Sequence, residues 1–200
     1  MKTSKALALA ISLGGVLLAP ALARASTWEI DPAHTAIEFS VRHMMVSTVK
    51  GQFEKVKGTL QLDDKDVSKS SVEVTIDLTS VNTHEPKRDG HLKSPDFFDV
   101  AKFPAATFKS TKVQKLSGGK LKVTGDLTLH GVTKSVVLEV EGPTVSYKTP
   151  FGTTVRGVHA TGKIDRKDFE IGWNKVLDNG GVMVGNEVGL ELNAELSEKP

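Results

Sequence analysis

A polar stretch between two strand-like segments holds the residues best suited to bind an anionic or polar group. Arg88, Asp89 and His91 lie close together there. An arginine can bind a phosphate through two parallel hydrogen bonds, or donate one hydrogen bond to a neutral carbonyl oxygen. Alternatively, Arg88 and Asp89 pair with partners of their own and hold this segment against the rest of the fold. Arg42 and Arg166 are weaker candidates, because single charges on strands are usually only solvated.

The histidines do not have the spacing of a metal site. They are His34, His43, His84, His91, His130 and His159. No two of them stand two residues apart, as on one face of a strand, or four apart, as on the helix of zinc hydrolases. The chain has no cysteine, which removes thiolate ligands and thiolate catalysis. We therefore expect no metal.

Motifs of the common enzyme classes are absent from the sequence. It contains no G-x-S-x-G elbow, no phosphate-binding P-loop and no dinucleotide fingerprint. A scattered Ser-His-Asp triad is recognised by geometry rather than by sequence. We therefore expect a binding protein rather than an enzyme, with an unrecognised hydrolase as the third alternative.

The first 25 residues have the pattern of a cleaved secretory signal peptide. Lys2 and Lys5 precede an apolar run over residues 6–19, and Ala23-Arg24-Ala25 fits the small-residue cleavage pattern. The run is shorter than the roughly 20 residues that a membrane-spanning helix needs. We expect residues 26–200 to form one exported, periplasmic domain.

Charge and composition exclude two further classes of protein. Removing Lys2, Lys5 and Arg24 lowers the 26 basic residues to 23, against 24 acidic residues, so no basic excess indicates nucleic-acid binding. An outer-membrane barrel would need aromatic girdles and an outward apolar band. One tyrosine, two tryptophans and charged residues along the alternate strand faces do not supply them. We expect no stable membrane insertion.

Alternation of apolar and polar residues dominates the mature chain and predicts strands with one buried face. The clearest segments are 34–43, 72–78, 121–129 and 187–196, and further strands are predicted at 28–30, 53–62, 105–116, 133–145 and 154–165. Turn residues such as Gly118-Gly119 and His130-Gly131 separate them. About eight or nine strands without intervening long helices indicate an all-β, mainly antiparallel sandwich or closed barrel.

One long connection interrupts this pattern. We expect a short helical segment near residues 84–99, with a helix over Glu85–Leu92 and a turn near Asp96. Such connections in compact domains are usually functional or cover part of the fold. Phe97, Phe98 and Phe103 would supply an apolar face to lie across the mouth of a barrel.

An ordered set of short motifs along the mature chain resembles the YceI-like polyisoprenoid-binding family. In chain order the set includes Trp28-Glu29-Ile30-Asp31, Gly51-Gln52-Phe53, Arg88-Asp89-Gly90-His91-Leu92, Asp96-Phe97-Phe98-Asp99, residues 125–133 and Arg166-Lys167-Asp168-Phe169. No single motif is specific, but their order is. The family often has glycine after this last phenylalanine, where Glu170 stands here, with Gly172 two residues further on.

The resemblance implies a lipocalin-like closed β-barrel of about eight strands, whose lumen holds an isoprenoid or quinone-type lipid, in a protein that is able to dimerise. The lipid would be the ligand, with no other cofactor. Apolar positions predicted to face the lumen are Ile37, Phe39, Val41, Phe53, Leu60, Val74, Ile76, Phe97, Phe98, Phe108, Leu127 and Leu129. Candidates for the lipid head group, a phosphate or a quinone, are Arg42, Arg88, Asp89, His91 and Arg166. The alternative is a stress-associated envelope protein whose barrel is filled and which acts through its surface.

Overall fold

The computed structural model describes residues 25–178 and 180–199, so the predicted signal peptide lies outside the described residues except for Ala25. One antiparallel sheet of twelve strands contains almost all of the regular structure. The strands are β1 (Ser26–Ile30), β2 (Ala36–His43), β3 (Ser47–Phe53), β4 (Val56–Leu62), β5 (Ser71–Asp77), β6 (Val81–Asn82), β7 (Ala105–Lys115), β8 (Lys120–Leu129), β9 (Val132–Glu141), β10 (Tyr147–Lys148), β11 (Thr154–Asp165) and β12 (Val184–Glu198). The helix α1 spans Pro86–Lys93.

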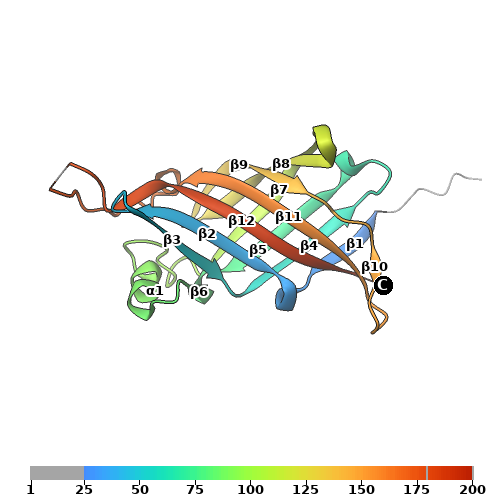
Figure 1. The fold of residues 1–200 in the computed structure, drawn as a ribbon, viewed down its shortest axis with the longest axis horizontal. Coiled ribbons are helices and arrows are strands. Elements are labelled where there is room, and N and C mark those ends of the chain that lie inside the picture. Colours follow the sequence, from blue (N-terminus) through green and yellow to red (C-terminus); the bar gives the residue numbers. More distant parts are fainter. Residues whose placement is uncertain (1–24, 179, 200) are drawn as a thin grey trace, which may run out of the picture.

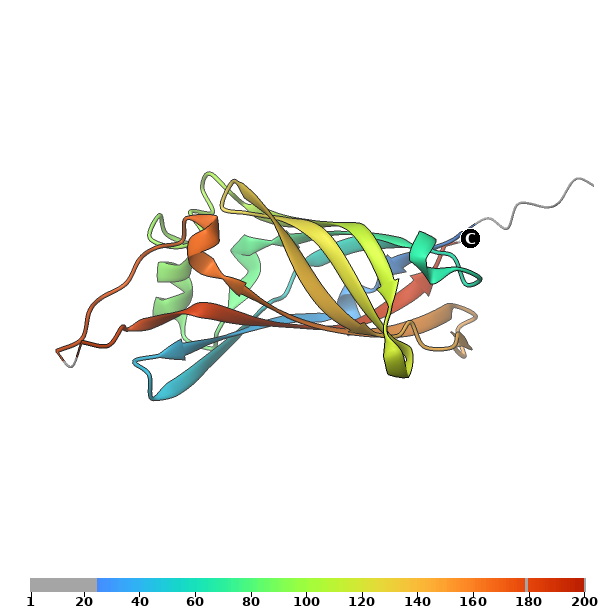
Figure 2. The same ribbon diagram turned by 90° about the horizontal axis from the view of Figure 1, so that it is seen from above.

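The sheet closes into a barrel because β12 pairs along both of its edges. Hydrogen-bonded neighbours run in the order β11, β9, β8, β7, β5, β4, β1 and β12, and β12 pairs in turn with β11. That last ladder runs from Val155 opposite Ser197 to Asp165 opposite Glu187. The ring therefore has eight members, and Figures 1 and 2 show that the barrel is elongated. The predicted all-β closed barrel is therefore confirmed.

Three positions around the ring are each shared by two consecutive strands, namely β1 with β2, β3 with β4 and β5 with β6. The other edge of β12 pairs with β2 through its first part and with β1 near its end. Pro32 lies in the 3-10 turn between β1 and β2, where a residue without an N–H cannot continue a ladder. The predicted single strand over 53–62 is wrong. Strand β3, which pairs with β2, ends at Phe53, and strand β4, which pairs with β1, starts at Val56.

The short helix α1 covers the end of the barrel where β6 has no ladder to β7. Among the strands of the described residues, β6 pairs with β3 alone. Helix α1 and the segment 94–104 lie beside it, opposite the end that holds β10 and the C-terminus (Figure 1). Glu85 caps the helix by accepting a hydrogen bond from the Lys87 N–H, and Pro86 occupies its first turn. Within the described residues, no helix is long and apolar enough to cross a membrane.

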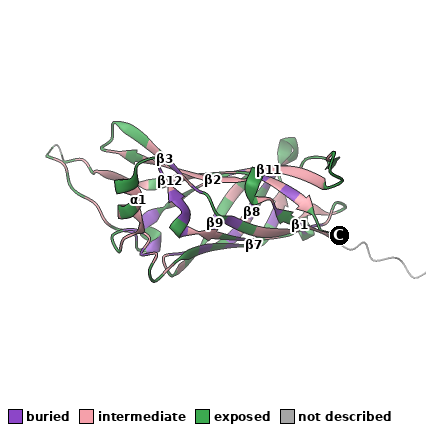
Figure 3. Ribbon diagram, turned by 90° about the horizontal axis from the view of Figure 1, so that it is seen from below, coloured by how far each residue is buried: buried purple, intermediate pink, exposed green. Residues whose placement is uncertain are grey.

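Burial alternates along the strands as the sequence predicts. In β8 the buried residues Leu121, Val123, Leu127 and Leu129 alternate with half-buried or exposed ones. Figure 3 shows buried, intermediate and exposed positions interspersed along the strands of the barrel. Phe103 differs from the prediction, because its ring packs 4.8 Å from that of His130 at the β8–β9 turn rather than across the mouth.

Glu170 ends the 3-10 turn Arg166–Phe169 with left-handed backbone geometry. Its φ is 61° and its ψ is 15°, a region that glycine occupies without the steric penalty that a Cβ brings. Its N–H donates to the Lys167 carbonyl, which fixes the chain direction toward Trp173. The family's usual glycine is therefore the residue that this position favours.

Replacing Glu170 with glycine should stabilise the fold. Relief of the left-handed strain, less the larger unfolded-state entropy of glycine, leaves a gain of about 0.5–1 kcal/mol in the free energy of unfolding. Urea unfolding measures it. Glu170→Ala is the matched control, since it removes the same charge and keeps the Cβ. An equal gain in both variants would assign the effect to the charge instead.

Candidate functional site

The barrel encloses an apolar cavity beside α1, which we call the outer cavity. Its free volume is about 200 Å³. Eleven of the twelve residues predicted to face the lumen lie on its wall: Ile37, Phe39, Val41, Phe53, Val74, Ile76, Phe97, Phe98, Phe108, Leu127 and Leu129. A partly filled barrel with such a wall can hold one slender apolar ligand.

A second space of about 100 Å³, the inner cavity, continues toward the end that holds the termini. Leu60, the twelfth predicted residue, lies on its wall together with Ile30, Leu62 and Leu121. The two cavities have five wall residues in common, namely Val74, Phe108, Leu138, Ala160 and Leu192. They are therefore adjoining parts of one apolar interior.

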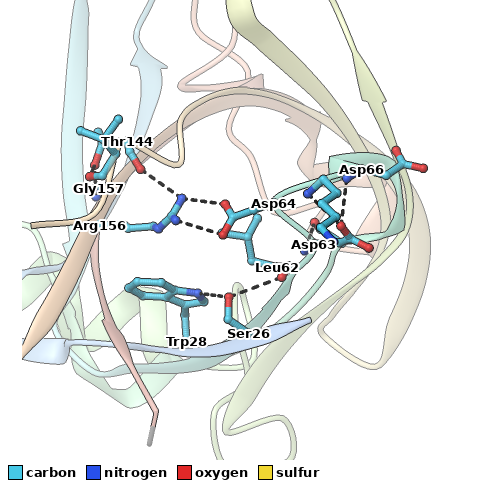
Figure 4. Close-up of polar contacts among 12 residues, drawn as sticks. Ser26, Trp28, Leu62, Asp63, Asp64, Asp66, Thr144, Arg156 and Gly157 are labelled. Atoms are coloured by element: carbon cyan, nitrogen blue, oxygen red, sulfur yellow. Dashed lines mark hydrogen bonds and ion pairs between the residues drawn. The ribbon is translucent and has the colours of Figure 1, made fainter. Parts of the chain in front are cut away.

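Trp28 and Arg156 cover the interior beyond the inner cavity. The Trp28 side chain is almost fully buried, and the Arg156 guanidinium carbon lies 5.0 Å from the centre of its ring. Arg156 also forms a two-pronged contact with Asp64, at 3.0 and 3.1 Å, and donates to the Thr144 carbonyl (Figure 4). The Trp28 Nε1–H donates to the Ser26 hydroxyl at 2.8 Å. This end of the barrel is therefore closed.

Arg166 is the buried charged group of the outer cavity wall, with 4% of its surface exposed. Its Nε donates to the carbonyl of Gly185, Nη1 donates to those of Ile171 and Trp173, and Nη2 donates to that of Val184. Burial lowers the pKa of the guanidinium, and the charge of Asp165 partly offsets this. No carboxylate among the described residues forms an ion pair with it.

This arrangement leaves binding capacity on Arg166. A guanidinium has five N–H groups, and the four hydrogen bonds use one on Nε, two on Nη1 and one on Nη2. One Nη2 N–H therefore has no acceptor among the described residues. Because carbonyl dipoles carry no net charge and no described carboxylate forms an ion pair with the guanidinium, Asp165 offsets its positive charge only in part.

The other four head-group candidates do not lie on the cavity wall, and three of them, Arg42, Arg88 and Asp89, are bonded to residues outside it. Arg88 donates from Nε to the Thr83 hydroxyl and from Nη2 to the Thr83 carbonyl. Asp89 accepts from the N–H and hydroxyl of the same threonine. These contacts hold α1 against the end of β6. Arg88 and Asp89 therefore do what the alternative expectation gave them, which is to hold their segment against the rest of the fold. Arg42 bonds to Thr48 and to the Met45 carbonyl in the β2–β3 hairpin.

His91 belongs to an aromatic cluster at the mouth. Its ring meets those of Phe97 and Trp173 edge-on, with centroids 4.9 and 4.8 Å apart, and its Nε2 lies 2.8 Å from Asp96 Oδ2. The cluster joins α1 to the loop that follows the 3-10 turn. The Trp173 carbonyl in turn accepts from Arg166, so the cluster and the buried guanidinium support each other.

The model of the YceI-like domain matches residues 28–196 of this chain. The chain belongs to the YceI-like family. UPF0312 protein SA2479 of Staphylococcus aureus is 39% identical over 172 residues, which cover 86% of this chain and 98% of that protein. The YceI resemblance seen in the sequence is therefore confirmed.

Solved structures share the YceI-like barrel. The YCEI protein of Campylobacter jejuni is 33% identical, with a TM-score of 0.67, over 80% of this chain and 90% of that one. A polyisoprenoid binding domain from Saccharophagus degradans has a TM-score of 0.60 at 17% identity, over 86% and 98% of the two chains, and this likeness is one of fold alone.

Sequence reasoning missed part of the YceI-like cavity wall. Leu138, Leu190 and Leu192 lie on strands in which apolar and polar residues alternate, so the same period-two argument would have found them. Ile171 and Val184 flank an irregular loop and carry no periodic signal. Arg156 and its contact with Trp28 had no signal either, because the two residues are distant in sequence.

One group of potential metal ligands also emerges on the outer surface of the described chain. Asp31, His34 and Glu195 place one ligand atom each within 4.8 Å of the others. The hydrogen bond between Asp31 and His34 lowers the pKa of the carboxyl and raises that of the imidazole. It also pins the turn that separates β1 from β2, which accounts for the contact without an ion.

Arg156→Met should destabilise the closed end by about 1–2 kcal/mol, because it removes the cation–π contact with Trp28 together with the ion pair. Chemical denaturation measures the loss. Asp64→Asn is the control, since it weakens only the ion pair to a carboxylate that is more than half exposed, and it should cost less than about 1 kcal/mol. Equal losses would show that the contact with the ring contributes nothing.

Proposed function

We propose that this protein binds an isoprenoid-type lipid, with the tail in the outer cavity and the head group beside Arg166, and that it carries the lipid outside the cytoplasm. The observation that carries the proposal is an apolar cavity in the barrel with one buried guanidinium on its wall that forms no ion pair with a described residue. The polyisoprenoid binding domain of the same fold supports the choice of ligand class. The pattern of residues 1–25 supports export.

The cavity wall suits a tail that has no polar atoms. Apart from Arg166, the wall residues with charged side chains are Glu38 and Glu191, which oppose each other on β2 and β12. They alternate with the inward residues of those strands, so their carboxylates face outward, and Glu191 lies 3.3 Å from His159. Burial of the tail then contributes roughly 25 cal/mol per Å² before the cost of ordering.

Arg166 suits a head group that accepts hydrogen bonds. The spare Nη2 N–H and the positive charge without an ion-pair partner favour a phosphate, and a quinone carbonyl could accept the same hydrogen bond with less electrostatic gain. The guanidinium is held in place by four carbonyls before any ligand arrives, so binding costs little side-chain entropy. The family and its structural neighbours suggest a binding protein rather than an enzyme.

Native mass spectrometry of the full-length gene product, purified from the envelope of its own cells, tests the proposal. Organic extraction should release a polyprenyl or quinone species in stoichiometric amount, and the polypeptide should start at Ser26. An empty protein that also takes up no added isoprenoid would overturn the proposal and favour the filled-barrel, surface-acting alternative.

Leu190→Trp should lower affinity for a polyprenyl ligand by at least about tenfold, because the larger side chain occupies outer-cavity space. Titration with a fluorescent isoprenoid measures the change. Val137→Trp is the control, since Val137 is 46% exposed on β9. Undiminished binding by Leu190→Trp, with its unfolding midpoint preserved, would place the tail elsewhere.

Arg166→Gln should distinguish the contribution of the head group to binding from that of the tail. We expect affinity for a polyprenyl phosphate to fall at least about tenfold while affinity for the matching alcohol stays within about twofold. Competition binding with the two ligands measures the ratio. A merely structural role of Arg166 would weaken both ligands alike, and that result would contradict the head-group assignment.

A further inference from the structure

The place where the outer and inner cavities meet has a regular construction. Along β8, inward residues line the inner cavity at Leu121 and Val123 and the outer cavity at Leu127 and Leu129. Gly125 stands between these pairs. Along β11, Val158 lines the inner cavity, Ile164 lines the outer one, and Gly162 lies between them. Each strand therefore has a glycine at the junction.

The two glycines lie beneath two large side chains of the junction. Phe108 and Leu138 line both cavities. A Cβ added to Gly125 would lie 2.6 Å from Cε2 of Phe108, and one added to Gly162 would lie 2.6 Å from Cδ2 of Leu138. Leu138 is the direct partner of Gly162 in the β9–β11 ladder. Both side chains thus lie flat across a neighbouring strand, in space that any other residue would fill.

We infer that Phe108 and Leu138, lying across Gly125 and Gly162, form a selectivity constriction through which the tail of a linear lipid passes into the inner cavity. The inference rests on the proposed function and deepens it, because it makes tail length the property that the protein recognises. The affinity for the lipid rises with each isoprene unit until the end of the tail reaches the closed end of the barrel at Trp28 and Arg156. Longer chains gain nothing further.

The polar groups of the interior set the direction of the ligand. Ser70 and Ser71 are the polar residues on the inner cavity wall, and the buried Ser70 hydroxyl already accepts from the Asp63 N–H at 3.0 Å. No charged side chain lines that wall. Arg166 lies on the outer cavity, so the end of the tail enters the inner cavity and the head group stays outside it.

Chain-length series on matched variants test the constriction. Binding of geraniol, farnesol, geranylgeraniol and solanesol is titrated on the mature protein and on two pairs of variants. Leu138→Ala widens the constriction, and its control Leu129→Ala removes the same atoms from the outer cavity alone. Gly162→Ala pushes the flexible end of Leu138 into the passage. Its control is Gly157→Ala on the same strand, where the nearest atom to the new Cβ is 3.5 Å away.

Gly162 is a better site for this test than Gly125. At Gly125 the new Cβ would also lie 2.6 Å from the Lys109 carbonyl oxygen, and backbone cannot move as cheaply as the end of a leucine. At Gly162 the nearest backbone atom is the Val137 carbonyl oxygen at 3.1 Å. Unfolding midpoints of all four variants accompany the titrations.

The expected result is a rise in wild-type affinity with chain length, followed by a plateau. Gly162→Ala should keep the affinity for geraniol and lose at least about tenfold for the chains that reach the inner cavity. Leu138→Ala should raise the affinity for the longer chains relative to that for geraniol. Leu129→Ala and Gly157→Ala should keep the wild-type dependence of affinity on chain length, which we call the length profile. Methyl NMR signals of Leu121 and Val123 should shift with geranylgeraniol and not with geraniol.

Two different results would overturn the inference. Length profiles that are the same in wild type, Leu138→Ala and Gly162→Ala would show that the tail never passes the constriction, and isoprenoid binding itself would still stand. Failure of the wild-type protein to bind any member of the series would overturn the proposed function, and with it the constriction that depends on it.

Discussion

The double pairing of β12 is the constraint on which the rest of the structure depends. One edge of this strand is taken by β11 over its whole middle, and the other edge is shared by β2 and β1. Closure leaves the sheet with an inside, and period-two alternation makes that inside apolar. Because β1 and β2 share one edge, the chain must break at Pro32, and the neighbouring strands break with it. The covered mouth at α1 follows from those breaks.

Free space inside the barrel depends on where large side chains come to rest. The outer cavity persists because aromatic and leucine side chains lie along the wall instead of across the lumen. Phe39 lies over Gly51 in the same manner as Phe108 over Gly125 and Leu138 over Gly162. A strand glycine weakens its own ladder, since it packs no side chain there. In this barrel it instead makes room for the side chain of a residue on the neighbouring strand.

Arg166 shows how a buried cation is tolerated without a buried anion. Four carbonyls, two from the loop after the 3-10 turn and two from the start of β12, surround the guanidinium, and they satisfy most of its donors without neutralising it. The carbonyl of Trp173 connects it to the His91–Phe97–Trp173 cluster that lies over the mouth. The charge and the aromatic cover are thus parts of one arrangement, formed by α1 and by the loop before β12.

The sequence by itself determined the strands and the faces that they bury. Alternation placed β8 and β11 within about a residue of their ends, and it identified inward residues from Ile37 to Leu129 that the structure places on the cavity walls. It did so because side-chain direction along a strand is a local property. The helix near Glu85 was likewise readable from its cap and its proline.

Only the tertiary structure decided which arginine lies at the cavity and which end of the barrel is closed. Arg88 was the leading candidate by composition, yet both it and Asp89 are bonded to Thr83, while the weaker candidate Arg166 lines the cavity. The partners of Arg166 come from a loop and from the next strand. The guanidinium of Arg156 lies over the ring of Trp28, which is distant in sequence. Such contacts depend on ring closure, which brings together residues that no local pattern relates.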